Sequence, residues 1–95
     1  MEIEKIRLER GSAIGLRIFL GKAPLILIKA DKGYLMCGYL NIAAAEKLGD
    51  AAAVVKGVST FNDMLNGTVV ELTSAAEALG IKMGMKGREA LERML

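Results

Sequence analysis

The alternation of apolar and polar residues in the first part of the chain constrains its fold more than any other feature. Ile6 and Leu8 alternate with charged neighbours, and from Ile14 to Leu20 every second residue is a large aliphatic one. A period of two residues is typical of strands that bury one face. The segment Leu25–Ile28 is apolar throughout, so this strand is expected to be covered on both faces.

Turn signals divide this region into four strands. Gly11-Ser12 predicts a two-residue hairpin turn with glycine first. Gly21–Pro24 interrupts the alternation, and Asp31–Gly33 predicts a short turn in which the glycine can adopt a positive φ. Residues 1–40 are therefore predicted to form a four-strand antiparallel meander, whose last strand is Tyr34–Leu40.

Capping residues predict short helices after residue 40. Asn41 is expected to cap a helix over 42–48 that ends at Gly49. Thr60 and Ser74 are each followed three residues later by an acidic residue, which predicts helices that end near residues 67 and 80. A final helix is predicted from residue 87 or 88 to residue 95.

Two β-rich segments, 52–56 and 68–72, lie between these helices. The predicted fold class is α+β, with a four-strand N-terminal antiparallel meander followed by short alternating helices and strands and a C-terminal helix. Its length predicts one domain over residues 1–95, divided into a β-rich part (1–40) and a mixed part (41–95).

The composition predicts self-association. Hydrophobic residues, two tyrosines included, make up 53 % of the chain without its eleven glycines. A typical domain reaches about 45–50 % with glycine counted in. A small domain cannot bury such an excess alone, and identical subunits are the commonest partners. We expect a homo-oligomer assembled through the strands of residues 1–40.

The chain is expected to be cytoplasmic and not to enter a membrane. The longest uncharged run, Gly33–Ala45, is too short to span a bilayer. The opening residues alternate acidic and apolar side chains, unlike a signal peptide. A single cysteine cannot form a disulfide within the chain.

Positive charge is concentrated between residues 5 and 32. This segment contains seven basic and two acidic residues. The basic residues are Lys5, Arg7, Arg10, Arg17, Lys22, Lys29 and Lys32, and the acidic residues are Glu9 and Asp31. They can form a solvated rim that keeps strand edges apart, or a surface for anions or nucleic acid. No aromatic stacking platform or known binding motif accompanies them, so nucleic acid is not an expected partner.

The absence of histidine excludes several chemistries. Without histidine there is no Ser–His or Cys–His dyad and no imidazole metal ligand. One cysteine cannot build a zinc or iron–sulfur site within a chain, although a tetramer could bring several together. We therefore predict no metal and no cofactor.

Cys37 is the only candidate nucleophile. Its neighbours are apolar, and free cysteine is among the residue types most often buried, which favours an inert core thiol. Activity would require an exposed sulfur and a positive field from the helix that begins near Asn41 or from Lys56. Gly84–Gly87 before the last helix is a weak match to a phosphate-binding loop, without the Walker or Rossmann glycine spacing.

The remaining candidates have structural readings as well. Asp31 suits a turn, Asn41 a helix cap, and Arg88 an exposed ion pair. The predicted ligand-binding positions are Asp31, Gly33, Cys37, Gly38, Asn41, Lys56, Gly84, Lys86, Gly87 and Arg88.

Three ordered segments resemble a known family. GYLMCGYL (33–40) resembles its central motif, 57–65 its GV-x-T-x-(D/N)-(D/E)-L-L stretch, and 79–91 its closing LGI-x-x-GM-x-GREAL. The chain therefore resembles the YunC-like domain-of-unknown-function family (domain of unknown function 1805) of bacteria and archaea. It departs from the family at Met64, where leucine is usual, and at Lys86, where serine would cap the last helix better.

The resemblance implies a small cytosolic α+β protein whose N-terminal strands form a tetramerising region. It implies no substrate and no reaction. The leading hypothesis is a non-catalytic small-ligand-binding or structural module. The alternatives are a cysteine-dependent enzyme or thiolate site centred on Cys37, and an anion or nucleic-acid binder that uses the basic N-terminal strands.

Overall fold

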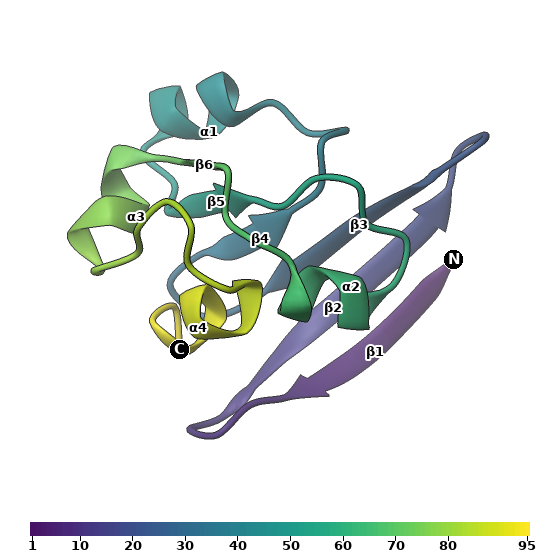
Figure 1. Cartoon of the computed structure of the whole chain (residues 1–95), viewed down its shortest axis with the longest axis horizontal. Coiled ribbons are helices and arrows are strands. Elements are labelled where there is room, and N and C mark those ends of the chain that lie inside the picture. Colours follow the sequence, from purple (N-terminus) through teal and green to yellow (C-terminus); the bar gives the residue numbers. More distant parts are fainter.

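Six strands form one mixed sheet in the order β1-β2-β3-β4-β5-β6 (Figure 1). The computed structural model describes residues 1–95. The strands are β1 (Glu2–Arg7), β2 (Ser12–Phe19), β3 (Pro24–Lys29), β4 (Tyr34–Met36), β5 (Ala52–Val54) and β6 (Glu71–Leu72). The helices are α1 (Ile42–Leu48), α2 (Phe61–Asn66), α3 (Ser74–Ala78) and α4 (Gly87–Glu92). The predicted α+β class is confirmed.

The first four strands form the predicted antiparallel meander, but its first turn differs from the prediction. Arg7 pairs with Ser12, so Ser12 is the first residue of β2 and the loop is residues 8–11. The Leu8 N–H donates to the Gly11 carbonyl at 2.8 Å inside this loop. The predicted two-residue turn at Gly11-Ser12 is therefore wrong.

The fourth strand is shorter than predicted. β4 ends at Met36, because the chain turns after Cys37 and the Leu40 N–H donates to the Cys37 carbonyl at 3.3 Å. The chain then crosses over through α1, and β5 returns parallel to β4. β6 pairs antiparallel to β5. Of the predicted strand 68–72, only Glu71–Leu72 forms a strand, while Thr68 makes an isolated bridge with Lys86.

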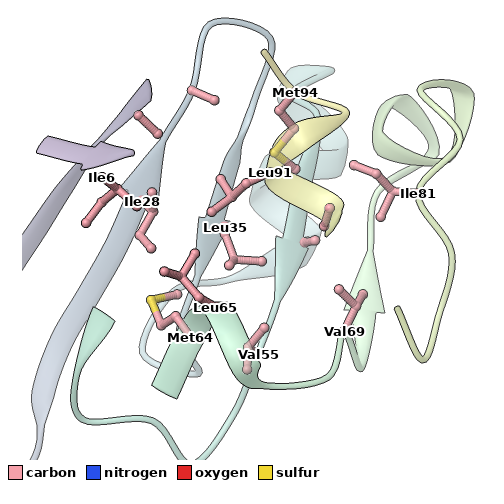
Figure 2. Packing of buried hydrophobic residues seen from close by; sticks show 14 of the residues in the cluster. Ile6, Ile28, Leu35, Val55, Met64, Leu65, Val69, Ile81, Leu91 and Met94 are labelled. Atoms are coloured by element: carbon pink, nitrogen blue, oxygen red, sulfur yellow. The ribbon is translucent and has the colours of Figure 1, made fainter. Parts of the chain in front are cut away.

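The main core lies between one face of the sheet and helices α2, α3 and α4. Ile28 and Leu35 point from the sheet towards Met64, Leu91 and Met94 (Figure 2). All five side chains are fully buried. Gly15 on β2 leaves room for the ring of Phe61, whose nearest atom would lie 2.6 Å from an added Cβ.

The opposite face is covered only in part. Helix α1 buries a small cluster, Met36, Ala45, Ala52 and Val54, over β4 and β5. No helix covers this face over β1 and β2, where Ile14 is 51 % exposed. On β3, Ile26 and Ile28 are buried but Leu25 and Leu27 are only half-buried. Within one chain this strand is therefore covered fully on one face and partly on the other.

Two predicted helix starts are confirmed and one moves. The Asn41 Oδ1 accepts the Ala43 N–H at 2.8 Å, and Thr60 forms a capping box with Asp63. The Ser59 backbone N–H donates to the Asp63 carboxylate and lowers its pKa. The third helix is capped by Thr73, because its Oγ1, and not that of Ser74, accepts the Ala76 N–H at 3.2 Å.

Candidate functional site

A cavity of about 300 Å³ lies beside Cys37. Three parts of the chain build it: the end of the β2–β3 loop with the first residue of β3, the turn after β4, and the loop after β5. Its lining is more apolar than polar and carries no charged side chain. The lining residues are Ala23, Pro24, Cys37, Gly38, Tyr39, Gly57 and Val58.

The Cys37 thiol is buried and already has a hydrogen-bond partner. Cys37 is 4 % exposed, and its Sγ accepts the Ile26 N–H at 3.4 Å. Its own N–H donates to the Ile26 carbonyl at 3.2 Å, which continues the pairing with β3 for one residue beyond β4. These two bonds hold Cys37 against β3, where it forms part of the cavity wall.

Lys56 lies close to this region but directs its charge elsewhere. Its Cγ lies 3.7 Å from a Cβ built on Gly38, so its stem packs beside the turn. Its Nζ lies 3.7 Å from the Glu71 carboxylate. Its ammonium is therefore paired with an acid of β6. The other expected source of a positive field was the start of α1, where the Asn41 side chain accepts the Ala43 and Ala44 N–H groups.

Tyr39 is one of five cavity residues that were not among the predicted positions, with Ala23, Pro24, Gly57 and Val58. Its hydroxyl donates to the Ala23 carbonyl at 3.3 Å and so joins the turn after β4 to the β2–β3 loop. Gly57 and Val58 were also missed as lining residues. Gly57 has a φ of 71°, a conformation that favours glycine. Both residues belong to the segment 57–65 that resembles a family motif, and this was the available signal.

Asp31 and Gly33 line a different hollow, of about 240 Å³, between the β3–β4 turn and the segment before β5. Gly33 is required by close approach, since an added Cβ would lie 2.3 Å from the Ala51 carbonyl oxygen. Its φ is not positive, so the predicted reason for this glycine is wrong. Beside it, the Tyr34 hydroxyl donates to Asp50 at 2.8 Å. Burial and then this carboxylate raise the pKa of Tyr34.

The loop Gly84–Gly87 uses its own polar groups within the fold. The Gly84 N–H donates to Val69 and the Gly87 N–H to Gly67, both at 2.9 Å. The Lys86 ammonium donates to the Asn66 carbonyl at 3.2 Å. These bonds occupy the backbone N–H groups of Gly84 and Gly87 and the Lys86 ammonium. Arg88 follows on the exposed side of α4.

The predicted ligand-binding positions therefore do not form one site. Cys37 and Gly38 share the first cavity, Asp31 and Gly33 share the second hollow, and the Gly84–Gly87 loop is bonded to the segment after α2. The chain contains no group of three or more His, Cys, Asp or Glu residues placed to hold a metal ion. None of its helices has the length and hydropathy to cross a membrane.

The chain is similar to two uncharacterised proteins over nearly its whole length. The uncharacterised protein YunC of Bacillus subtilis (strain 168) is 37 % identical over 99 aligned positions, which cover 100 % of this chain and 98 % of YunC. A crystal structure of a protein of unknown function, TA1206 from Thermoplasma acidophilum, superposes with a TM-score of 0.94 at 39 % identity. The superposition covers 99 % of this chain and 92 % of the TA1206 chain.

A family model also matches residues 36–94. The matched segment begins at the last residue of β4 and includes β5, β6 and all four helices. It therefore includes the Cys37 cavity wall, the Thr60 capping box and the Gly84–Gly87 loop. The chain belongs to the family described as Domain of unknown function (DUF1805).

Proposed function

We propose that this protein is a non-catalytic homo-oligomeric module whose subunits associate through the open face of β1, β2 and β3. The observation that carries the proposal is an apolar patch on the part of this sheet face that α1 leaves open. Register places its members side by side: Ile3 pairs with Leu16, Leu16 with Leu27, and Ile18 with Leu25. We call this set the open-face patch: Ile3, Ile14, Leu16, Ile18, Leu25 and Leu27.

The exposure of the open-face patch supports this proposal. Ile3 is 65 % and Ile14 51 % exposed, while the other members are half-buried. An apolar surface that crosses three adjacent strands gains free energy when it leaves water, at about 25 cal/mol per Å². A second copy offers the same surface, and two sheets packed face to face bury their inner sides as in a β-sandwich.

The charges of β1 favour pairing by faces over pairing by edges. β1 is an edge strand with the sequence EIEKIR. A two-fold antiparallel pairing of β1 with itself places one residue opposite its own copy. Near the middle of the strand that residue would be Glu4 or Lys5, and like charges directly opposite each other are destabilising. The edge is thus protected against closed pairing. The open face also carries basic residues, but Lys5 and Lys29 lie beside Ile14 at one end of the open-face patch, whose own members are all apolar.

Light scattering at micromolar concentration tests the proposal. We expect a tetramer, as the family resemblance implies, or at least a dimer, and a monomer would contradict it. Leu16→Lys and Ile18→Lys should lower the mass, because each places a charge in the buried contact. Met83→Lys is the matched control. Met83 is 62 % exposed but lies far along the chain from the open-face patch, so the oligomer mass of this variant should equal that of the wild type.

The Cys37 cavity favours a second candidate function, the binding of a small molecule. A volume of about 300 Å³ is at the lower end of ligand pockets, and its lining is mostly apolar with the Tyr39 hydroxyl at its side. Native mass spectrometry of the purified assembly would detect a retained molecule beside the subunit count. Tyr39→Ala should then release the bound molecule without changing the oligomer.

We place the module in the cytoplasm, where an unpaired cysteine is usual.

A further inference from the structure

A groove of about 370 Å³ lies at the opposite end of the sheet from β1. Its base is β6, and α1 and α3 form its two sides (Figure 1). It shares no residue with the Cys37 cavity or with the open-face patch. The lining residues are Ile42, Glu46, Val70, Glu71, Leu72, Thr73, Ser74, Glu77 and Met83.

The base of the groove is an open strand edge. β6 pairs with β5 on one side and has no strand on the other. An extended segment can add to such an edge through main-chain hydrogen bonds. The side chains of an added strand would point alternately towards α1 and towards α3, because successive residues of a strand face opposite sides.

Apolar side chains are left exposed along this edge. Met83 is 62 % and Val70 39 % exposed, and Ile42 and Leu72 are half-buried. Residues of this kind at a strand edge offer contacts for the apolar side chains of an added segment.

The charge of the groove is negative although the whole chain has a net charge of +2. Glu46, Glu71 and Glu77 line the groove, and no lysine or arginine does. Glu46 accepts the Ser74 N–H at 2.8 Å, and Glu71 lies 3.7 Å from Lys56. Glu77 makes neither an ion pair nor a side-chain hydrogen bond within the chain.

These carboxylates are spread along the groove and do not converge. No three acidic side chains of the chain are placed to hold one metal ion. An extended segment with separated positive charges matches this arrangement better than a single ion does. A second copy of this chain is a poorer occupant, because its own edge strand β1 carries two acidic and two basic residues and so has no net positive charge.

We propose that this groove binds an extended, cationic segment of a partner protein, which adds to β6 as a further strand. Its apolar residues contact Val70 and Met83, and its lysines or arginines face Glu71 and Glu77. Such complexes use main-chain bonds for affinity and alternate side chains for specificity.

A labelled peptide of alternating lysine and valine, about six residues long as a typical strand is, serves as the probe. Fluorescence anisotropy with the full-length protein should show saturable binding that weakens as salt screens the charges. A glutamate–valine peptide of equal length should not bind. Glu71→Gln combined with Glu77→Gln should weaken binding about three- to tenfold. Glu89→Gln, an exposed acid on α4 outside the groove, is the control and should bind as the wild type does.

Three results would overturn the proposal. One is the absence of saturable binding by the lysine–valine peptide while the protein is folded by circular dichroism. Another is an affinity that does not change in the Glu71→Gln, Glu77→Gln variant. The third is a loss of oligomer mass in Met83→Lys, which would assign the groove to a second copy of the chain.

Discussion

Cys37 shows how burial decides the chemistry of a single residue. Sequence alone left open an inert thiol and a reactive one. The side chain is 4 % exposed, accepts an N–H from β3, and has no free cation directed at it. Reagents and substrates reach a thiol of this kind only when the packing between β3 and β4 opens.

We therefore expect slow modification of Cys37 by a thiol reagent in the native protein and rapid modification after denaturation. Cys37→Ala should fold, at a stability cost of about 1–2 kcal/mol from the small cavity it leaves. Labelling rates followed by absorbance, with and without denaturant, measure the difference. Fast labelling of the native protein at neutral pH would support the alternative of a cysteine-dependent site.

At the scale of elements, Thr73 joins strand β5 to helix α3. Its Oγ1 accepts N–H groups from Ala52 at 3.0 Å and Ala76 at 3.2 Å, and it donates to the Asp50 carbonyl at 2.7 Å. Thr73 is the only buried polar residue of the chain, at 1 % exposure. One side chain thus caps α3 and fixes it against the sheet.

Thr73→Val should destabilise the protein by about 1–3 kcal/mol, because it leaves buried backbone groups without their hydroxyl partner while keeping the side-chain volume. Ser74→Ala is the neighbouring control and should cost much less, since the Ser74 side chain bonds only the exposed Glu46. Urea unfolding of both variants measures the two costs. Equal values would show that the helix cap at Thr73 contributes nothing of its own.

At the scale of the whole molecule, the basic residues of the N-terminal strands do not form one surface. Arg17 lies on the helix-covered face, where it pairs with Glu2 at 2.7 Å and donates to the Ser59 carbonyl at 2.8 Å. Lys5 and Arg7 lie on the opposite face, by their register with Ile14 and Ser12. Positive charge divided between two faces suits a solvated rim better than a binding surface.

We expect no specific nucleic-acid binding at physiological ionic strength. Any weak association should vanish with salt, because it would rest on the release of counterions alone. Gel-shift or anisotropy titrations across a salt series test this expectation. A salt-sensitive complex with a submicromolar dissociation constant would instead support the nucleic-acid alternative. In that case, a variant with Lys5 and Arg7 replaced could be compared with a variant with Arg17 replaced. The variant with the larger loss of affinity would show which face binds the nucleic acid.

The sequence by itself determined the features that depend on near neighbours. Alternating residues predicted the first two strands, because a period of two leaves one face apolar wherever the strand lies, and a short apolar run predicted the third. Asn41 and Thr60 predicted two helix starts, because a cap bonds N–H groups only two or three residues away. The family motifs identified the family because each motif is a short run of consecutive residues that can be read without the fold.

Only the tertiary structure decided what depends on distant segments. Ser74 and Thr73 are both suitable caps locally, but contacts with β5 place the hydroxyl of Thr73 in the cap. Gly33 reads as a turn residue, yet the Ala51 carbonyl is what excludes a side chain there. The strand lengths after residue 36, the burial of Cys37 and the groove at β6 likewise follow from packing between parts of the chain far apart in sequence, which no local pattern encodes.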